Sequence, residues 1–159
     1  MGGNLDLTVA AIVEDDKRFL FVEELVSGQP VINQPAGHVE PGESVFDAVI
    51  REALEETAWH FSPEAVTGIY LWTHPDKLQT FLRVAFCGYC RDHEPDRALD
   101  DGILRTLWLS RDELEHRAGR LRSPMVTRCI DDYLGGARNA VPTIRSLPIQ
   151  ALIERAVIL

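Results

Sequence analysis

The sequence predicts an α/β fold with a mixed β-sheet, and three observations support this prediction. Segments rich in β-branched and aromatic residues occur on both sides of one strongly acidic segment, residues 44–58. The acidic segment has the periodicity of a helix, and a second helix is expected near the C-terminus. Because each helix must bury one face against a sheet, this combination is typical of an α/β sandwich.

Several extended segments are expected between turn signals. Asp15 and Asp16 mark a turn between the first two strands, and the run from Ser27 to Pro30 is expected to break the chain after the second. The run Pro75 to Lys77 connects the two longest strands. The expected extended segments are residues 7–13, 19–24, 34–36, 66–73, 81–89 and 103–110.

Helix boundaries are predicted from capping signals. Ser44, with an acidic residue three positions later, has the pattern of a capping box and is expected to start the acidic helix. Ser110 is expected to cap a short helix over residues 111–116. A further helix is expected after Ser123-Pro124 and should end at Gly135-Gly136, because proline suits the first turn of a helix and glycine its end.

Length, composition and charge limit the class of protein. The 159 residues correspond to about one domain, which we expect to span residues 1–136 with an extension at residues 137–159. A hydrophobic content of 45% with 26% charged residues is that of a soluble globular protein. The net charge of -9 argues against a general nucleic-acid surface, which needs a basic stripe. No apolar run approaches a membrane span, so we expect a cytoplasmic protein without nucleic-acid or membrane partners.

The cysteines and the C-terminal tail carry little functional signal. Cys87 and Cys90 have the spacing of half a zinc or redox motif, but no second pair exists, and strand alternation places them on opposite faces. We expect these two residues and Cys129 to be buried or partly buried structural thiols. Apolar residues of the tail have helical spacing and are expected to pack on the domain or to form a dimer contact, so we expect a monomer or a homodimer. These residues are Ile149, Leu152, Ile153 and Val157.

The acidic helix concentrates carboxylates on one face. Glu52, Glu55 and Glu56 stand at positions i, i+3 and i+4, so they share a narrow arc of the helix. Three like charges at this spacing repel one another, and a cation is therefore expected among them. Mg2+ prefers oxygen ligands and is bound by a few carboxylates together with water and substrate phosphate. The pattern predicts a magnesium-phosphate site, although acidic triplets also occur on exposed helices of acidic proteins.

The spacing around this helix resembles the signature of the Nudix hydrolases. Gly37 is followed by five residues and Glu43, and then by seven residues and Arg51-Glu52. An apolar residue, any residue and Glu55-Glu56 complete the pattern. The resemblance implies an α/β/α sandwich with a mixed sheet.

One position departs from that signature. The family usually has glycine two residues after the last glutamate, where this chain has Ala58. Because such a glycine normally ends the helix or lets the chain turn closely, we expect a different helix exit here, with the helix running on into Trp59.

Outside the signature, the chain is similar to the NudJ-type phosphatases of this family, from about Leu5 to Leu134. These enzymes are nucleoside triphosphatases and diphosphatases that also act on the pyrophosphate of the thiamine pyrimidine precursor. The residues that carry this similarity are Asn33 to His38, Trp72, Pro75 to Lys77, Phe81 to Arg83, Trp108 and Leu121 to Pro124.

The resemblance implies hydrolysis of a phosphoanhydride by water. Glu52, Glu55 and Glu56 would hold one or more Mg2+ ions, or Mn2+, with help from the Gly37 carbonyl. The general base is either Glu52 or an acid of the pair Asp100-Asp101, and a solvated turn explains that pair equally well.

Glu43 and Arg51 are expected to form a pair that fixes the motif loop against the helix. A cation left free inside the carboxylate cluster would compete with the metal, so the role of Arg51 is orientation rather than catalysis.

Substrate contacts are assigned from residue type and place. Arg83 lies within an apolar strand, where burial requires a carboxylate or a phosphate partner, and a structural ion pair is the favoured explanation. Lys77 could reach a terminal phosphate from its loop. Asn33 and Gln34 could read the edge of a base, or could bond loop backbone. Trp72 could stack on a ring, although an aromatic residue at a strand end more often belongs to the core or rim.

These observations predict a Mg2+-dependent hydrolase of nucleoside diphosphates, nucleoside triphosphates or related pyrophosphates such as hydroxymethylpyrimidine pyrophosphate. The alternative is a non-catalytic nucleotide-binding sensor with the same fold. Such a module usually has eroded metal carboxylates, and here the set is intact. Action on capped or triphosphorylated RNA is disfavoured by the acidic charge.

Overall fold

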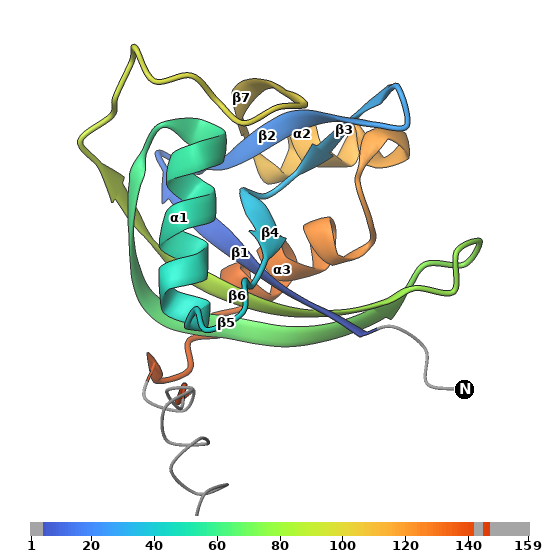
Figure 1. Ribbon diagram of the computed structural model, residues 1–159. Coiled ribbons are helices and arrows are strands. Elements are labelled where there is room, and N and C mark those ends of the chain that lie inside the picture. The colour runs from blue at the N-terminus through green and yellow to red at the C-terminus, as the bar shows by residue number, and fades with distance from the viewer. Residues whose placement is uncertain (1–4, 142–144, 147–159) are drawn as a thin grey trace, which may run out of the picture.

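The chain forms a mixed β-sheet with helices packed on both faces (Figure 1). A computed structural model describes residues 5–141 and 145–146. The strands are β1 (Leu5–Asp15), β2 (Arg18–Val26), β3 (Gln29–Asn33), β4 (Ala36–His38), β5 (His60–Thr73), β6 (Thr80–Arg91) and β7 (Ile103–Leu109). The helices are α1 (Val45–Thr57), α2 (Arg111–Glu115), the short 3-10 helix η1 (Ala118–Arg120) and α3 (Met125–Leu134).

The sheet divides at β1. Residues 5–13 of β1 pair in parallel with residues 80–88 of β6, and β6 pairs antiparallel with β5. On its other side, β1 pairs antiparallel with β4 through residues 8–10 and with β2 only at Glu14 and Asp15. β2 in turn pairs antiparallel with β3 and β7. The parallel β1–β6 pair makes the sheet mixed, and β4 occupies the place where β1 and β2 separate.

Alternation along β1 builds a core on each face of the sheet. Val9, Ala11 and Val13 pack with apolar residues of α1, whereas Ala10 and Ile12 pack with residues of α2 and α3. A strand that is buried on both faces lies at the centre of a layered fold. The predicted α/β/α sandwich is therefore confirmed, with α1 on one face and α2 and α3 on the other (Figure 1).

Helix α1 begins where its cap predicts and ends in a strained turn. The backbone N–H of Asp47 donates a 3.0 Å hydrogen bond to Ser44 Oγ, which caps the helix. At the other end, Ala58 adopts the left-handed conformation with φ 60° and ψ 17°. The expectation that the helix continues into Trp59 is therefore wrong. Ala58 takes the conformation in which glycine is normal, because the chain must turn from α1 into β5, which begins at His60.

Three strands differ from the sequence prediction. β3 occupies residues 29–33, which the prediction treated partly as a chain break because of Pro30. β3 is an edge strand of the sheet, where proline costs no ladder hydrogen bond. β4 starts at Ala36, so it lies two residues later than the predicted segment, and β5 starts six residues earlier than predicted, at His60. The early part of β5 contains Pro63 beside a register shift, which weakened its signal.

The cysteine prediction is confirmed. Cys87 packs in the core under α3, whereas Cys90 packs on the α1 side, so the two thiols lie on opposite faces of β6. Cys87 and Cys129 are buried, Cys90 is partly buried, and all three are free thiols.

The chain after α3 returns to the edge of the sheet. The backbone N–H of Asn139 donates to the Val66 carbonyl at 2.8 Å, and the N–H of Val66 donates back at 3.0 Å. The apolar tail residues 149–157 lie outside the described residues. Among the helices that the structure describes, none combines the length and apolar character needed to cross a membrane.

Candidate active site

Two of the three glutamates on the acidic face of α1 are buried. Glu52 and Glu56 are only 9% and 7% exposed, whereas Glu55 remains partly exposed. Glu52 and Glu56 are spaced by three residues from Val49 and Ala53, respectively, which pack on the sheet. They therefore lie on the same face of the helix, and both carboxylates point inward. Burial at these positions requires polar partners or a counter-ion.

β4 supplies the wall against which both carboxylates lie. The backbone N–H of Ala36 donates a 2.9 Å hydrogen bond to Glu56 Oε2. The Glu52 carboxylate occupies the space where a side chain at Gly37 would be, so a Cβ there would overlap it. Glycine at position 37 is therefore required by close approach, since its backbone has no positive φ.

The electrostatics of the pair favour an added cation. Burial raises the pKa of Glu56 to about 9, and nearby Glu24, Glu52 and Asp100 act in the same direction against the Ala36 hydrogen bond. Burial also raises the pKa of Glu52, although Arg51 opposes this. A bound cation would restore the charged form of both carboxylates.

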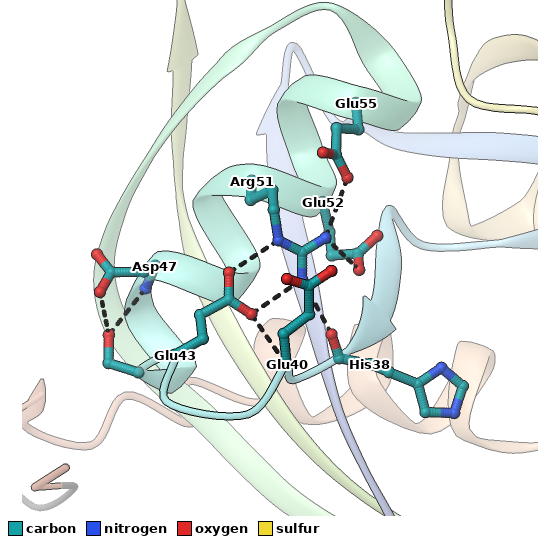
Figure 2. Close-up of polar contacts among 8 residues, drawn as sticks. His38, Glu40, Glu43, Asp47, Arg51, Glu52 and Glu55 are labelled. Carbon is teal, nitrogen blue, oxygen red and sulfur yellow. Dashed lines mark hydrogen bonds and ion pairs between the residues drawn. The ribbon is translucent and has the colours of Figure 1, made fainter. Parts of the chain in front are cut away.

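Arg51 is bound to three carboxylates at once (Figure 2). Its Nε and Nη2 donate to the two oxygens of Glu43 at 2.8 and 2.9 Å, which is the bidentate pair that the sequence predicts. Its Nη1 also donates to Glu52 at 2.8 Å and to Glu55 at 3.0 Å. Arg51 therefore also bridges two carboxylates of the predicted metal site, because its guanidinium has enough donors to reach Glu52 and Glu55 as well as Glu43.

Arg51 also fixes the motif loop. Its Nη2 donates to the His38 carbonyl at 3.0 Å, and the backbone N–H of Glu40 donates to Glu43 Oε2 at 3.0 Å. The loop between β4 and α1 is thus held to the helix at both ends (Figure 2).

The donor chemistry of the site suits a hard divalent cation. The predicted ligands are carboxylate oxygens of Glu52, Glu55 and Glu56 and the backbone of Gly37, and Mg2+ and Mn2+ take such ligands. Within residues 5–141 and 145–146, no three acidic, His or Cys side chains already surround one point in the way a metal requires. In this structure Arg51 supplies part of the countercharge, through its contacts with Glu52 and Glu55.

The structure separates the two acids of the loop before β7. The backbone N–H of Asp100 donates to the Glu55 carbonyl at 3.0 Å, and the Asp100 carboxylate contributes to the raised pKa of Glu52 and of Glu56. Both residues are exposed, but Asp101 has neither a hydrogen bond with these carboxylates nor an effect on their pKa values among the described residues. The fold therefore brings Asp100 to the site and leaves Asp101 outside.

A cavity of about 170 Å³ borders β4. Ala36 and Gly37, which contact the two buried glutamates, also line this cavity. β4 therefore borders both the carboxylates and the cavity. The lining residues are Thr8, Glu24, Asn33, Ala36, Gly37, His38, Trp72, Phe81, Arg83, Arg122, Ser123 and Met125.

The predicted substrate residues divide into two groups. Asn33, Trp72 and Arg83 line the cavity. Gln34, which directly follows β3, is fully buried and donates to the Val126 carbonyl at 2.7 Å, so it ties this segment to α3 and does not line the cavity. Lys77 is exposed in the β5–β6 hairpin, which extends away from α1, and it does not line the cavity (Figure 1).

Arg83 is held without a carboxylate partner among the described residues. Its Nη1 donates to Gln34 Oε1 at 3.0 Å and its Nη2 donates to Asn33 Oδ1 at 3.2 Å, while Nε has no partner. The structural ion pair expected from the sequence is therefore wrong. Burial lowers the pKa of Arg83, whose guanidinium lines the cavity.

No site role was predicted for Glu24, Arg122 or Ser123, which come from two separate parts of the chain, although Arg122 and Ser123 belong to the run Leu121 to Pro124 that carries the family similarity. Glu24 could have been found, because Glu23 and Glu24 directly follow the buried apolar run of β2. Arg122 and Ser123 precede α3, and the sequence offers no signal that places them opposite β2.

Comparison with known proteins agrees with this geometry. The NUDIX domain model matches residues 4–129. Phosphatase NudJ of Escherichia coli (strain K12) is 37% identical over 132 residues, which cover 83% of this chain and 85% of that protein. A NUDIX hydrolase of known structure from Nitrosomonas europaea is 44% identical with a TM-score of 0.88, over 91% of this chain and 98% of that chain. A MutT protein from Methanosarcina mazei, 20% identical over 87% of this chain and 99% of that chain, has a TM-score of 0.67 and shares the fold.

The matched region contains every element from β1 into α3, together with the buried glutamates and the Arg51 network. The chain therefore belongs to the Nudix family of hydrolases and acts on pyrophosphate bonds.

Proposed function

We propose that this hydrolase requires Mg2+, or Mn2+, and cleaves nucleoside diphosphates, nucleoside triphosphates or related pyrophosphates such as hydroxymethylpyrimidine pyrophosphate. The observation that carries the proposal is that β4 contacts the two buried carboxylates and also lines the cavity. A substrate with a ring and a polyphosphate chain could place its ring in the cavity and its phosphates beside these carboxylates.

The helix carboxylates hold the cation in this proposal. Glu52 and Glu56 are its main ligands because they are buried and short of positive charge, and Glu55 and the Gly37 carbonyl complete the set. When bound, the metal neutralises charge on the non-bridging phosphate oxygens. Enzymes of this family generally use divalent metals such as Mg2+.

The remaining task is to accept the proton of the attacking water. Glu52 and Asp100 are the two candidates, since both lie at the cluster and Asp101 does not. Replacing Asp100 by Asn distinguishes them. If Asp100 is the base, the acidic limb of the pH profile of kcat disappears, and if Glu52 is the base that limb remains.

The proposal also covers partners and surroundings. A small phosphorylated substrate agrees with the name of the related phosphatase and with the size of the cavity. We propose a cytoplasmic monomer or homodimer without nucleic-acid or membrane partners, with residues 1–136 as the catalytic domain. The net charge of -9 supports the absence of a nucleic-acid surface.

A panel of phosphorylated substrates tests this proposal. Purified protein would be assayed for phosphate and pyrophosphate release from nucleotides and pyrimidine pyrophosphates with Mg2+ and with EDTA. The proposal predicts turnover that EDTA abolishes. Substrate binding without turnover under all conditions would contradict it and would favour the non-catalytic sensor.

A further inference from the structure

The cavity beside β4 has the size of a single ring. Its volume of about 170 Å³ is close to the roughly 150 Å³ of an engineered cavity that binds benzene. Trp72 and Phe81 form one wall as a stacked pair, with ring centroids 5.9 Å apart and an interplanar angle of 22°. Aromatic walls of this kind favour a flat ring as the ligand.

Glu24 is held in this cavity by a relay of buried side chains. Arg83 Nη2 donates to Asn33 Oδ1 at 3.2 Å, and Asn33 Nδ2 donates to Glu24 Oε1 at 3.2 Å. Since both ends of the Asn33 amide are engaged, Asn33 positions Glu24. Glu24 Oε2 has no hydrogen bond among the described residues, which leaves one carboxylate oxygen available to a ligand.

Two further polar groups complete the cavity. Ser123 is only 7% exposed and lines the cavity, and its Oγ has no hydrogen-bond partner in the part of the chain that the structure describes. A buried hydroxyl without a partner is unusual and indicates that a ligand group can satisfy it. Arg122 lies 3.8 Å from Glu24 Oε1, too far for a hydrogen bond, so its guanidinium also has donors to offer.

We propose that Glu24 is a specificity-determining residue that accepts a hydrogen bond from the exocyclic amino group of an aminopyrimidine ring. Arg122 and Ser123 donate to the acceptor atoms of the same ring. This inference rests on the proposed function, because it names the ring whose polyphosphate would lie at the glutamates of α1.

The single free oxygen of Glu24 favours an amino group over the ring N–H of uracil. The N–H of uracil lies between two carbonyl oxygens, and both would be brought toward the carboxylate and repelled. An amino group projects from its ring and meets the carboxylate without that repulsion.

A double-mutant cycle between protein and substrate tests the proposal. Hydrolysis of cytidine triphosphate would be compared with that of its pyrimidin-2-one analogue, which lacks only the amino group, using the native protein and the Glu24→Gln variant. We expect the native protein to prefer the amino substrate by about 10- to 100-fold in kcat/KM, as expected for a hydrogen bond to a charged group. In Glu24→Gln this ratio should fall toward one. Glu64→Gln, the same change at an exposed position of β5, should keep the native ratio.

Binding measurements separate this proposal from the hydrolytic function. Equilibrium binding of cytidine monophosphate and its deamino analogue would be measured by calorimetry on the same three proteins. Amino-selective binding that Glu24→Gln loses supports the cavity assignment even if no substrate is hydrolysed, in which case only the hydrolytic function fails. The proposal is overturned if Glu24→Gln keeps the native selectivity, or if the native protein binds the deamino analogue as tightly as cytidine monophosphate.

Discussion

The carboxylate of Glu52 occupies the space that a side chain at position 37 would need, so glycine is required there for close approach. Gly37→Ala should displace this carboxylate from β4. A displacement of about 1 Å at a reacting centre can lower the rate roughly 100-fold, and we expect a loss of kcat/KM of that order. Gly119→Ala is the matched control, because a Cβ at Gly119 meets nothing within 4 Å. Steady-state kinetics with melting curves check the result, and equal activity of the two variants would contradict it.

Replacing Arg51 by Lys tests whether activity depends on the bidentate geometry of the guanidinium or only on its positive charge. Lys cannot bind both oxygens of Glu43 and also reach Glu52 and Glu55, so the loop and the carboxylates should lose their alignment. Supporting residues of metal sites typically contribute about 10- to 100-fold in affinity or activity, and we expect a loss in this range. Arg111→Lys is the matched control. Arg111 also binds two carboxylates, those of Asp131 and Glu115, but it lies in α2, so its replacement should leave kcat/KM unchanged. Native activity in Arg51→Lys would show that charge alone suffices.

Ala58→Gly should stabilise the protein. The left-handed conformation costs a non-glycine residue about 1–2 kcal/mol, whereas burial of the alanine methyl returns about 0.8 kcal/mol. Since Ala58 is 3% exposed, both effects apply, and we expect a gain of up to about 1 kcal/mol. Urea unfolding measures this difference. A lower midpoint for the glycine variant would mean that the turn carries no strain.

Glu23 should make stability depend on acid pH. The hydrogen bond from Arg105 is the largest cause that holds the pKa of Glu23 below its ordinary value of 4.5, and Arg120 adds to it. In the window below 4.5 the unfolded chain therefore binds more protons at this site than the folded protein does. The stabilisation is present above the ordinary pKa and is lost as pH falls through the lowered pKa of the folded state.

Glu23→Gln should cost about 1–2 kcal/mol at pH 7, because it removes a charged partner from two arginines. The difference from the native protein should narrow as the pH of the urea experiment is lowered toward about 3, where Glu23 is protonated in both states. Glu115→Gln, at an exposed ion pair with Arg111, should have almost no effect at either pH. A cost for Glu23→Gln that is the same at both pH values would contradict the assignment.

The sequence predicts those parts of the site that short-range periodicity controls. The i, i+4 repeat that carries Val49 and Ala53 into the core also carries Glu52 and Glu56 inward, and Ser44 fixes where the helix begins. The pairing of Arg51 with Glu43 also follows from the sequence motif. The contacts of Arg51 with Glu52 and Glu55 could not be predicted, because the number of donors that a guanidinium uses depends on side-chain positions.

The cavity could not be predicted, because its residues meet only through the fold. Asn33 and Gln34 are neighbours in sequence, yet Gln34 points under α3 while Asn33 points toward Glu24. Ser123 reaches the same cavity from the segment before α3, and no local pattern records that approach. These residues are brought together by pairing between strands that are far apart in sequence. The sequence of a single segment does not predict such pairing.

The affinity for Mn2+, measured by electron paramagnetic resonance, tests the central claim most directly. The claim is that the buried carboxylates of Glu52 and Glu56 hold a divalent cation. The double variant Glu52→Gln and Glu56→Gln keeps the shape of both side chains and an acceptor for the Ala36 amide, so it should fold and should bind Mn2+ at least about 100-fold more weakly than the native protein. The exposed control Glu64→Gln should bind as the native protein does. Native affinity for Mn2+ in the folded double variant would contradict the account.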